Sequence, residues 1–465
     1  MEKKRGSFTG SIGFVLAAAG SAVGLGNIWR FPYLAAKDGG GIFLLVYLVL
    51  ALTFGFTLLT TEVAIGRKTK QSPLTAYKQL QPKWGFLGIL ACLVPIIIMP
   101  YYSSIGGWVL HYFAAFLSGK SELAAQDGYF GGFITQTTAP LIFMFIFMLA
   151  AAVIVFLGVD KGIEKCSKIL MPLLLIMIIG IAIFSLTITH TDDNGVTRSG
   201  LEGLAVYVIP DFAGMTVGKF LTVIMDAMGQ LFYSLSVAMG IMIAYGSYMK
   251  DDVNMGKSIN QIEIFDTLVA FLAGMMIIPA VFVFMGEEGM TAGPSLMFIA
   301  LPKIFSAMGG IGVIIGIVFF LMVLFAAITS AVSIMEAIVA SFMDSFHITR
   351  RVACVISFVI SLALAVVVCL GYNHLYFELK LPNGSVGQVL DVMDYVSNNV
   401  MMPIVSILTC ILIGWVLGPK FITDEVEKNG GRMGRKALYN VMVRFIAPIL
   451  LFILFLQSIG ILHLA

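Results

Sequence analysis

The chain has 465 residues, of which 59% are hydrophobic and only 12% are charged, with a net charge of +2. A soluble protein needs more polar residues to cover its surface, so the composition excludes a soluble globular domain. A helix crosses a bilayer with about 20 apolar residues, and short alternating segments typical of a membrane β-barrel are absent. Eleven apolar stretches are long enough, centred near Val23, Leu52, Pro100, Phe147, Ile178, Leu235, Val269, Val323, Ala363, Ile404 and Leu451. We therefore predict an all-α polytopic membrane protein with about 11 spans.

The basic residues predict its orientation. With a cytoplasmic N-terminus, only seven of the 28 lysines and arginines would face the outside: Arg30, Lys37, Lys120, Arg198, Lys219, Lys303 and Lys380. The positive-inside rule favours this arrangement, and eleven spans then place the C-terminus outside. We expect a multi-pass protein of the cell (inner) membrane without a cleavable signal, because MEKKRGSF leads into a Gly-rich span without a cleavage site. The five cysteines include no CxxC pair, so we expect neither a disulfide framework nor a zinc site.

Two spans are interrupted at corresponding places. The first contains GSAVGLGNIWRFP at residues 20–32, and the sixth contains SVAMG at residues 236–240. They are five spans apart, so the two halves would cross the membrane in opposite directions, as in an inverted repeat with a midplane site. The alternative is that the glycines only allow close helix packing. We expect one domain, 1–465, with a first repeat at about 8–189, a second at about 218–417 and an additional helix at about 437–464. The short apolar segment 291–305 is expected to be re-entrant or to lie on the surface.

A broken span carries chemistry of its own. An unwound turn frees backbone groups, which is tolerated in a membrane only where a cavity or ligand receives them. Freed carbonyls attract a cation, and the N–H groups at the start of the next half-helix attract a carboxylate. The break in the first span therefore predicts a joint site for a cation and a carboxylate.

Three motifs carry a resemblance to a known family. GSAVGLGNIWRFP with the following GGG, QLFYSLSVAMG at 230–240 and AAITSAVSIM at 326–335 resemble the neurotransmitter:sodium symporter family. The likeness covers essentially the whole chain and is greatest to the prokaryotic amino acid transporters, such as the bacterial leucine transporter. It implies sodium-coupled import of a small molecule by alternating access, an inverted repeat of five plus five helices with helices 1 and 6 broken, and no enzymatic activity.

The resemblance implies two sodium ions and no organic cofactor. The first ion would be held by Ala22, Asn27, Ser234, Asp266 and the substrate carboxylate. The second would be held by the carbonyls of Gly20, Val23 and Ala326 and the hydroxyls of Thr329 and Ser330. Uncharged oxygen ligands suit a monovalent ion that must later leave. The alternative for the two hydroxyls is hydrogen bonding within their own helix.

Asp266 departs from the family pattern. Chloride-dependent members use a Tyr, a Gln, a hydroxyl, an Asn and a Ser, whereas this chain keeps Tyr47, Gln230 and Ser234 but has Asp266 and Ala270. A carboxylate inside a membrane is costly and is a functional candidate. We predict that it replaces chloride, with protonation on the return step as an option. The alternative is a protonated Asp266 that caps a helix.

Gly24 indicates the substrate class. Family members that carry amines have an Asp there, so a glycine predicts a ligand with its own carboxylate. Neutral, hydrophobic or aromatic amino acids are favoured, because a charged side chain would be desolvated in a pocket without a charged wall. The resemblance implies a substrate site formed by Ser21, Ala22, Gly24, Leu25, Gly26, Ile98, Tyr102, Tyr233, Ser234, Ser236, Met239, Ser330 and Ile334.

Two gates are implied. Outside, Arg30 would face Asp394 directly or through water, above Tyr102 and Tyr233. Inside, Arg5 would pair with Asp344, near Tyr248, Glu336 and Ser247, although Arg5 could instead be a simple positive-inside anchor.

A proton-coupled permease of the same fold remains an alternative to the sodium symporter, and a channel or a non-transporting sensor is a further one. The oligomeric state is left open, and no nucleic-acid partner is indicated.

Overall fold

The computed structural model describes residues 6–192, 195–210, 212, 214–286, 289 and 295–462. The first half contains α1 (Ser11–Ala22), η1 (Gly26–Arg30), α2 (Phe31–Lys37), α3 (Gly41–Leu50), η2 (Ala51–Gly55), α4 (Phe56–Thr69), α5 (Pro73–Leu80), η3 (Pro82–Trp84), α6 (Gly85–Leu117), α7 (Ser121–Ala124), α8 (Tyr129–Ile134), α9 (Thr138–Phe156), η4 (Val159–Glu164), α10 (Lys165–Thr187), β1 (Thr189–Thr191), β2 (Thr197–Ser199) and α11 (Gly200–Val208).

The second half contains α12 (Val217–Ser234), α13 (Ile241–Ser247), α14 (Met255–Met285), η6 (Leu296–Ala300), α15 (Leu301–Ala307), α16 (Gly310–Phe346), α17 (Arg350–Leu370), β3 (Leu379–Lys380), β4 (Val386–Gly387), α18 (Val389–Asp394), η7 (Tyr395–Met401), α19 (Met402–Ile411), η8 (Leu412–Val416), α20 (Lys420–Val426), η9 (Lys428–Gly430), α21 (Lys436–Val441), η10 (Met442–Ile446) and α22 (Ala447–Ser458). Strands β1 and β2 form one antiparallel hairpin, with Thr189 opposite Ser199, and β3 and β4 form another, with Leu379 opposite Gly387.

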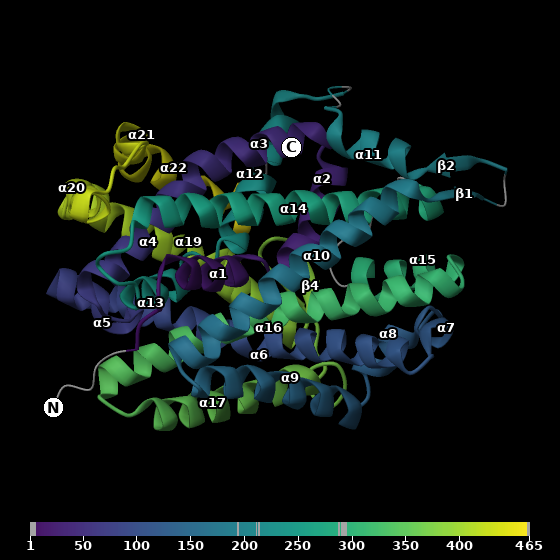
Figure 1. The fold of residues 1–465 in the computed structure, drawn as a ribbon, viewed down its shortest axis with the longest axis horizontal. Helices are drawn as coiled ribbons and strands as arrows, with labels where there is room; N and C mark the ends of the chain where they lie inside the picture. Colours follow the sequence, from purple (N-terminus) through teal and green to yellow (C-terminus); the bar gives the residue numbers. More distant parts are fainter. Residues whose placement is uncertain are drawn as a thin grey trace.

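The long helices run side by side between two faces of the molecule (Figure 1). The N-terminal segment lies at one end with α5, α13 and α20, at the left of the view, and we call this end the N-terminal face. Helices α7 and α15 and the β1–β2 hairpin lie at the other end, which we call the opposite face. Polar connections therefore gather at the two ends, as expected of a bundle that crosses a membrane.

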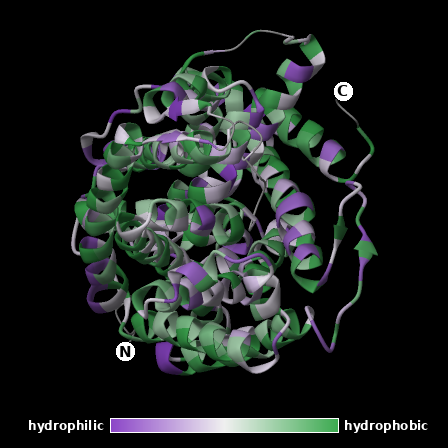
Figure 2. Cartoon of the chain, turned by 90° about the vertical axis from the view of Figure 1, so that its right-hand side faces the viewer, coloured by the Kyte–Doolittle hydropathy of each residue, from purple (hydrophilic) through white to green (hydrophobic). Residues whose placement is uncertain are grey.

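The predicted membrane class is confirmed. Among the described residues, nine helices are long and apolar enough to cross a bilayer, and the bent pair Ser11–Ala22 and Gly26–Lys37 makes a tenth span. The stretch expected near Leu235 is divided into α12 and α13, which are shorter helices. Hydrophobic residues follow most of the helices (Figure 2), and side chains such as Ile176 and Ile264 are 67% and 65% exposed. Such exposure suits a surface that faces lipid rather than water.

Both interruptions predicted from the sequence are present. The first span leaves the helical path at Val23, whose φ is −78° and ψ is 93°, and the helix axes on either side differ by 54°. In the sixth span φ is positive at Ser236, Ala238 and Gly240, at 53°, 64° and 71°. Positive φ is uncommon for residues other than glycine, so the surrounding contacts must hold the two non-glycine residues in place.

The broken helices lie in the middle of the bundle. Helix α1 packs against α10, α14 and α16, and α13 packs against α4. The last contact is backbone to backbone: a Cβ on Gly66 would lie 1.9 Å from the Ile243 carbonyl oxygen, and one on Gly246 would lie 2.3 Å from that of Val63. Small residues thus bring α4 next to the break in the sixth span.

Two further expectations concern the connections. The segment expected to be re-entrant contains the apolar helix Leu296–Ala307, which is too short to cross a bilayer, while residues 291–294 lie outside the described residues. The boundaries expected for the two repeats fall in or near the connections that follow α10, precede α12 and follow η8. The exact division of the chain into repeats stays a prediction.

Candidate functional site

A cavity lies where the two breaks meet α6 and α16. All thirteen residues predicted to bind the substrate line it, together with Asn27. The lining consists of Ser21, Ala22, Gly24, Leu25, Gly26, Asn27, Ile98, Tyr102, Tyr233, Ser234, Ser236, Met239, Ser330 and Ile334. These residues come from segments that are up to about 300 positions apart in the chain, so the fold assembles the set that the sequence motifs indicated. Their role in binding stays a prediction.

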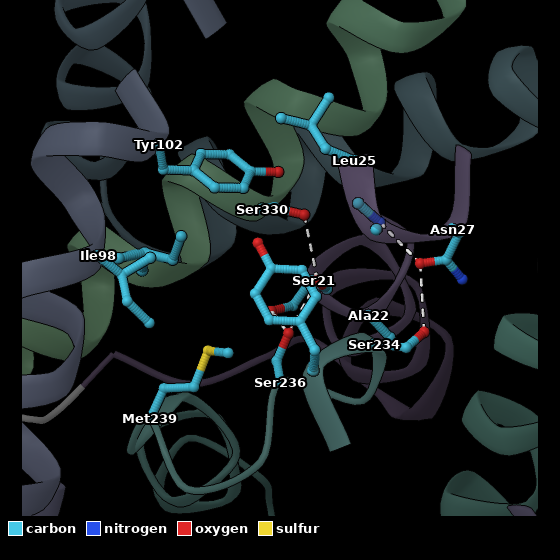
Figure 3. A pocket seen from close by; sticks show the side chains of 14 residues that line it. Ser21, Ala22, Leu25, Asn27, Ile98, Tyr102, Ser234, Ser236, Met239 and Ser330 are labelled. Atoms are coloured by element: carbon cyan, nitrogen blue, oxygen red, sulfur yellow. Dashed lines mark hydrogen bonds between the residues drawn. The ribbon is translucent and has the colours of Figure 1, made fainter. Parts of the chain in front are cut away.

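The cavity has a polar and an apolar side. In Figure 3, Ile98, Met239 and the ring of Tyr102 lie on one side, and Asn27 and Ser234 lie on the other. Its free volume is about 20 Å³, which is about the space that one water molecule needs. An amino acid therefore needs the surrounding helices to move apart, and this conformation is a closed one.

At two glycine positions of the first break, neighbouring side chains leave no room for a Cβ atom. A Cβ on Gly24 would lie 2.9 Å from the Ser330 Oγ and 3.3 Å from the Tyr102 hydroxyl, and a Cβ on Gly26 would lie 2.8 Å from a ring carbon of Tyr233. Any side chain at either position would enter the cavity or displace a wall residue. Gly24 contributes no acidic side chain to the cavity, and a ligand that brings its own carboxylate stays a prediction.

Asp266 lies at the centre of a buried hydrogen-bond network. Its Oδ1 accepts from the Asn27 amide at 2.9 Å and from the Ser234 hydroxyl at 2.7 Å, while its Oδ2 accepts from the Tyr47 hydroxyl at 3.3 Å. Ser234 also lies 3.2 Å from the Asn27 Oδ1. Asp266 and Asn27 are fully buried. The structure therefore brings together three of the four residues predicted for the first sodium, and the fourth, Ala22, lines the adjoining cavity.

The residues predicted for the second sodium lie where α1 ends against α16. The Ser330 hydroxyl lies 3.4 Å from the Gly20 carbonyl oxygen and 3.5 Å from that of Val23. Thr329 instead donates within its own helix, to Phe325 at 3.0 Å and Ala326 at 3.1 Å. Gly20 and Thr329 are nevertheless close neighbours, because a Cβ on Gly20 would lie 3.3 Å from the Thr329 Cβ. All five of these groups thus belong to two clusters, Ser330 with Gly20 and Val23 and Thr329 with Ala326, which meet at Gly20.

Two groups that bind the interrupted segments of the first and sixth spans were not predicted from the sequence: the Ser21 carbonyl and the Glu62 carboxylate. The Ser21 carbonyl accepts from Ser236 at 2.9 Å and from Ser330 at 3.1 Å, so it joins both broken spans to α16. Glu62 of α4 is 3% exposed, and its Oε1 accepts from the Ala238 N–H at 2.6 Å. A glutamate within the apolar segment TTEVAIG was the available signal, because a carboxyl group inside a span is usually functional or structural.

The outer gate is formed in part. No ion pair within 4 Å joins Arg30 and Asp394 in the described part of the chain; Asp394 accepts from the Asn398 amide at 2.6 Å, and Asn398 also donates to Tyr101 at 3.2 Å. Arg30 lines a separate cavity with Asp226 at the opposite face. A water-mediated Arg30–Asp394 contact stays a prediction.

Acidic side chains gather near this gate. Lys37 lies 2.8 Å from Asp226 and 3.8 Å from Asp38. Asp38 is 7% exposed, and burial, reinforced by the charge of Asp226, raises the pKa of Asp38 to about 7. Asp38 therefore changes charge near neutral pH, which gives the opposite face a titratable group.

At the N-terminal face, the predicted partner Arg5 lies outside the described residues. Asp344 accepts from the backbone N–H of Ser72 at 2.7 Å. Glu336 accepts from the Tyr248 hydroxyl at 2.6 Å and from both terminal nitrogens of Arg350, at 2.7 Å each. The sequence reasoning placed Tyr248 and Glu336 together but missed Arg350.

The N-terminal segment closes over this face. The N–H of Phe8 donates to the Tyr248 carbonyl at 3.1 Å, and its ring packs against Phe14, Tyr245 and Tyr248. Burial of an aromatic ring at this position stabilises the closed arrangement. Phe8 is 1% exposed, so the N-terminal segment is packed against α13 at this face.

Comparisons with known proteins agree with this architecture. The model of the sodium:neurotransmitter symporter family matches residues 5–127 and 133–463. The chain is 33% identical to an uncharacterized sodium-dependent transporter, YhdH, of Bacillus subtilis over 99% of both chains. It is 26% identical to the human sodium- and chloride-dependent GABA transporter 2, over 92% of this chain and 77% of that protein.

A solved structure shares the fold. The crystal structure of MhsT in complex with L-phenylalanine has a TM-score of 0.84 and 35% sequence identity to this chain, and the match covers 98% of this chain and 100% of MhsT. Together with the broken spans, these matches favour a sodium-dependent carrier of small molecules over a proton-coupled permease, a channel or an enzyme. The chain belongs to the sodium:neurotransmitter symporter family.

Proposed function

We propose that this sodium-dependent symporter imports neutral amino acids with hydrophobic or aromatic side chains and does so without chloride. The observation that carries the proposal is the composition of the central cavity: its described wall contains serine, glycine, asparagine, tyrosine and apolar residues and no charged side chain. A charged substrate side chain would lose its hydration there without gaining a partner, at a cost of several kcal/mol. Phenylalanine in MhsT, which shares the fold, supports this substrate class.

The two sides of the cavity supply the two parts of an amino acid site. The substrate carboxylate would meet the N–H groups of Leu25 and Gly26 and the hydroxyl of Tyr102, while its ammonium group would meet the carbonyls of Ala22 and Tyr233. The Tyr102 hydroxyl is buried without a hydrogen-bond partner in the described part of the structure, so a ligand oxygen would satisfy it. The side chain would lie between Ile98 and Met239, and the flexible Met239 could adapt to a large ring.

Chloride independence rests on Asp266. Its carboxylate lies within hydrogen-bonding distance of two predicted sodium ligands, Asn27 and Ser234. A fixed negative charge there would balance the first sodium ion in a site shielded from water, where electrostatic interactions are strong. Ala270, which is fully buried, offers no hydroxyl to a chloride ion.

The two faces provide the alternating gates. In this conformation the N-terminal segment covers one face and the tyrosines cover the cavity. Opening one side at a time requires that Phe8 leave Tyr248 at the N-terminal face in one state and that Arg30 and Asp394, which no direct ion pair joins in this conformation, move further apart in the other. We propose that the N-terminal face is cytoplasmic, in agreement with the distribution of basic residues.

Uptake into proteoliposomes tests this proposal. Purified protein is reconstituted, a sodium gradient is imposed, and uptake of labelled leucine, phenylalanine, tyrosine, tryptophan, methionine, glutamate and lysine is measured in chloride and in gluconate. We expect uptake of one or more neutral amino acids, dependent on sodium and equal in both anions. A requirement for chloride would refute the role of Asp266, and uptake of glutamate or lysine at comparable rates would refute the argument from the cavity wall.

A further inference from the structure

A second cavity lies at the N-terminal face, away from the central site. It has a volume of about 460 Å³ and is formed where α4, the first turns of α14 and the connection between α20 and α21 meet; α20 and α21 are at the upper left of Figure 1. Its described lining contains three basic residues, Lys257, Arg432 and Arg435, and no acidic residue. The cavity is therefore positively charged.

Only one of these three cations is neutralised. Arg435 makes hydrogen bonds to Glu263 at 3.0 and 2.7 Å, and its guanidinium lies 3.6 Å from the centre of the Phe56 ring. Lys257 and Arg432 are exposed, and neither has an acidic partner within 4 Å among the described residues. Two uncompensated positive charges thus remain at the rim.

The floor of the cavity contains a hydroxyl group without a partner. Thr60 is 1% exposed, and its Oγ1 makes no hydrogen bond in the described structure. Two other threonines of the same helix behave differently: Thr57, one turn earlier, and Thr61, the next residue, donate to the carbonyls four residues before them, at 2.8 and 2.7 Å. A buried unsatisfied hydroxyl costs about 1–3 kcal/mol, so Thr60 is available to donate to an acceptor that enters the cavity.

Two lipid-facing surfaces lead to this cavity. On α3 and η2, the exposed side chains of Leu45, Val49 and Leu52 are 56%, 60% and 45% accessible. They are spaced three and four residues apart and form one stripe that ends beside Phe56 at the cavity. On α14, Ile264 and Leu268 continue the row of Asn260, which lines the cavity, and are 65% and 43% exposed. A ligand here would meet positive charge at one end and apolar side chains along its length.

We propose that this cavity binds the headgroup of an anionic phospholipid. The phosphate would lie between Lys257 and Arg432 and accept the hydrogen of the Thr60 hydroxyl, and the acyl chains would follow the stripes of η2 and α14. Basic pockets between membrane helices on the cytoplasmic side favour anionic headgroups. The apolar stripes distinguish a lipid from a soluble phosphate, because they would add nothing to the binding of a free ion.

Native mass spectrometry of the purified full-length protein tests the proposal. Phosphatidylglycerol or phosphatidylcholine is titrated into the detergent-solubilised protein, and the apparent affinities are compared for wild type, Lys257→Gln/Arg432→Gln and Thr60→Val. We expect wild type to prefer phosphatidylglycerol. Each cation near a membrane surface contributes about 1 kcal/mol, or about fivefold, so the double variant should lose about 25-fold in affinity and Thr60→Val about fivefold or more.

The matched control is Lys78→Gln/Lys83→Gln, which removes two exposed cations near the same face but outside the cavity, and it should bind like wild type. Equal binding by wild type and Lys257→Gln/Arg432→Gln, or no preference over phosphatidylcholine, would overturn the proposal. Displacement of phosphatidylglycerol by millimolar inorganic phosphate would indicate a soluble-anion site and would also overturn it. Unchanged sodium-dependent substrate binding by the variants verifies that they are folded.

Discussion

Replacement of Asp266 by asparagine separates the charge of this residue from its shape. Asn27 and Ser234 both donate to Oδ1, at 2.9 and 2.7 Å, whereas Tyr47 donates to Oδ2 at 3.3 Å. An asparagine with its oxygen in the Oδ1 position keeps the first two hydrogen bonds, and its amide can donate to the Tyr47 hydroxyl oxygen. We therefore expect Asp266→Asn to fold normally and to lose only the negative charge.

The loss should be seen in the sodium dependence. A sodium ion about 4 Å from a carboxylate is stabilised by about 4 kcal/mol at an effective dielectric constant of 20, and about 1.4 kcal/mol corresponds to a factor of ten. The sodium concentration for half-maximal binding of a labelled amino acid should therefore rise by up to about 700-fold. The measurement is a sodium titration of the purified protein at constant ionic strength, in chloride and in gluconate.

Asp252→Asn is the control, because Asp252 is exposed and lies outside the central cavity. It should leave the sodium titration unchanged. If Asp266→Asn also leaves it unchanged, Asp266 carries no charge opposite the ion, as the alternative of a protonated residue predicts. In the double variant Asp266→Asn/Ala270→Ser, but not in wild type, added chloride should lower the sodium requirement, because chloride would then supply the missing charge.

Three further predictions concern single residues. Gly24→Ala places a methyl group 2.9 Å from the Ser330 Oγ, so substrate affinity, measured by isothermal titration calorimetry, should fall by about tenfold or more. Unchanged affinity would show that the substrate binds elsewhere. Ser330→Ala removes the hydroxyl that lies near the Gly20 and Val23 carbonyls. The sodium concentration for half-maximal uptake should therefore rise about tenfold. An unaltered concentration would exclude this hydroxyl as a sodium ligand. The pKa of Asp38 is raised to about 7. The folded protein therefore binds more protons than the unfolded chain between about pH 4 and pH 7. Its melting temperature should fall as the pH rises through this range. Asp38→Asn should flatten that dependence in a thermal-shift assay, and an equally steep dependence in the variant would assign it to another group.

Much of the fold and of the candidate site could be predicted because the relevant signals are local in the sequence. Each span is an apolar stretch of sufficient length, and the breaks coincide with glycines and small polar residues in otherwise apolar segments. The thirteen substrate residues and the group Asn27, Ser234 and Asp266 were implied by the resemblance of a few motifs to a known family. The thirteen line one cavity, and the other three are joined by hydrogen bonds.

Other features depend on which helices pack together, and no local pattern specifies that. Glu62 reaches the Ala238 N–H across 176 residues of sequence, and this contact exists because glycines let α4 and α13 approach closely. Arg350, which the sequence reasoning did not include in the gate, binds Glu336 together with Tyr248. Thr329 donates within its own helix although it lies beside the predicted sodium ligands. The sequence by itself determined the membrane class and the two breaks, because hydropathy and helix interruption are local properties, and the resemblance of its motifs to a known family indicated the lining residues. The tertiary structure alone decided which buried polar groups satisfy one another. A hydrogen bond forms only when the donor and the acceptor lie about 2.7–3.2 Å apart, and the packing of distant segments sets that distance.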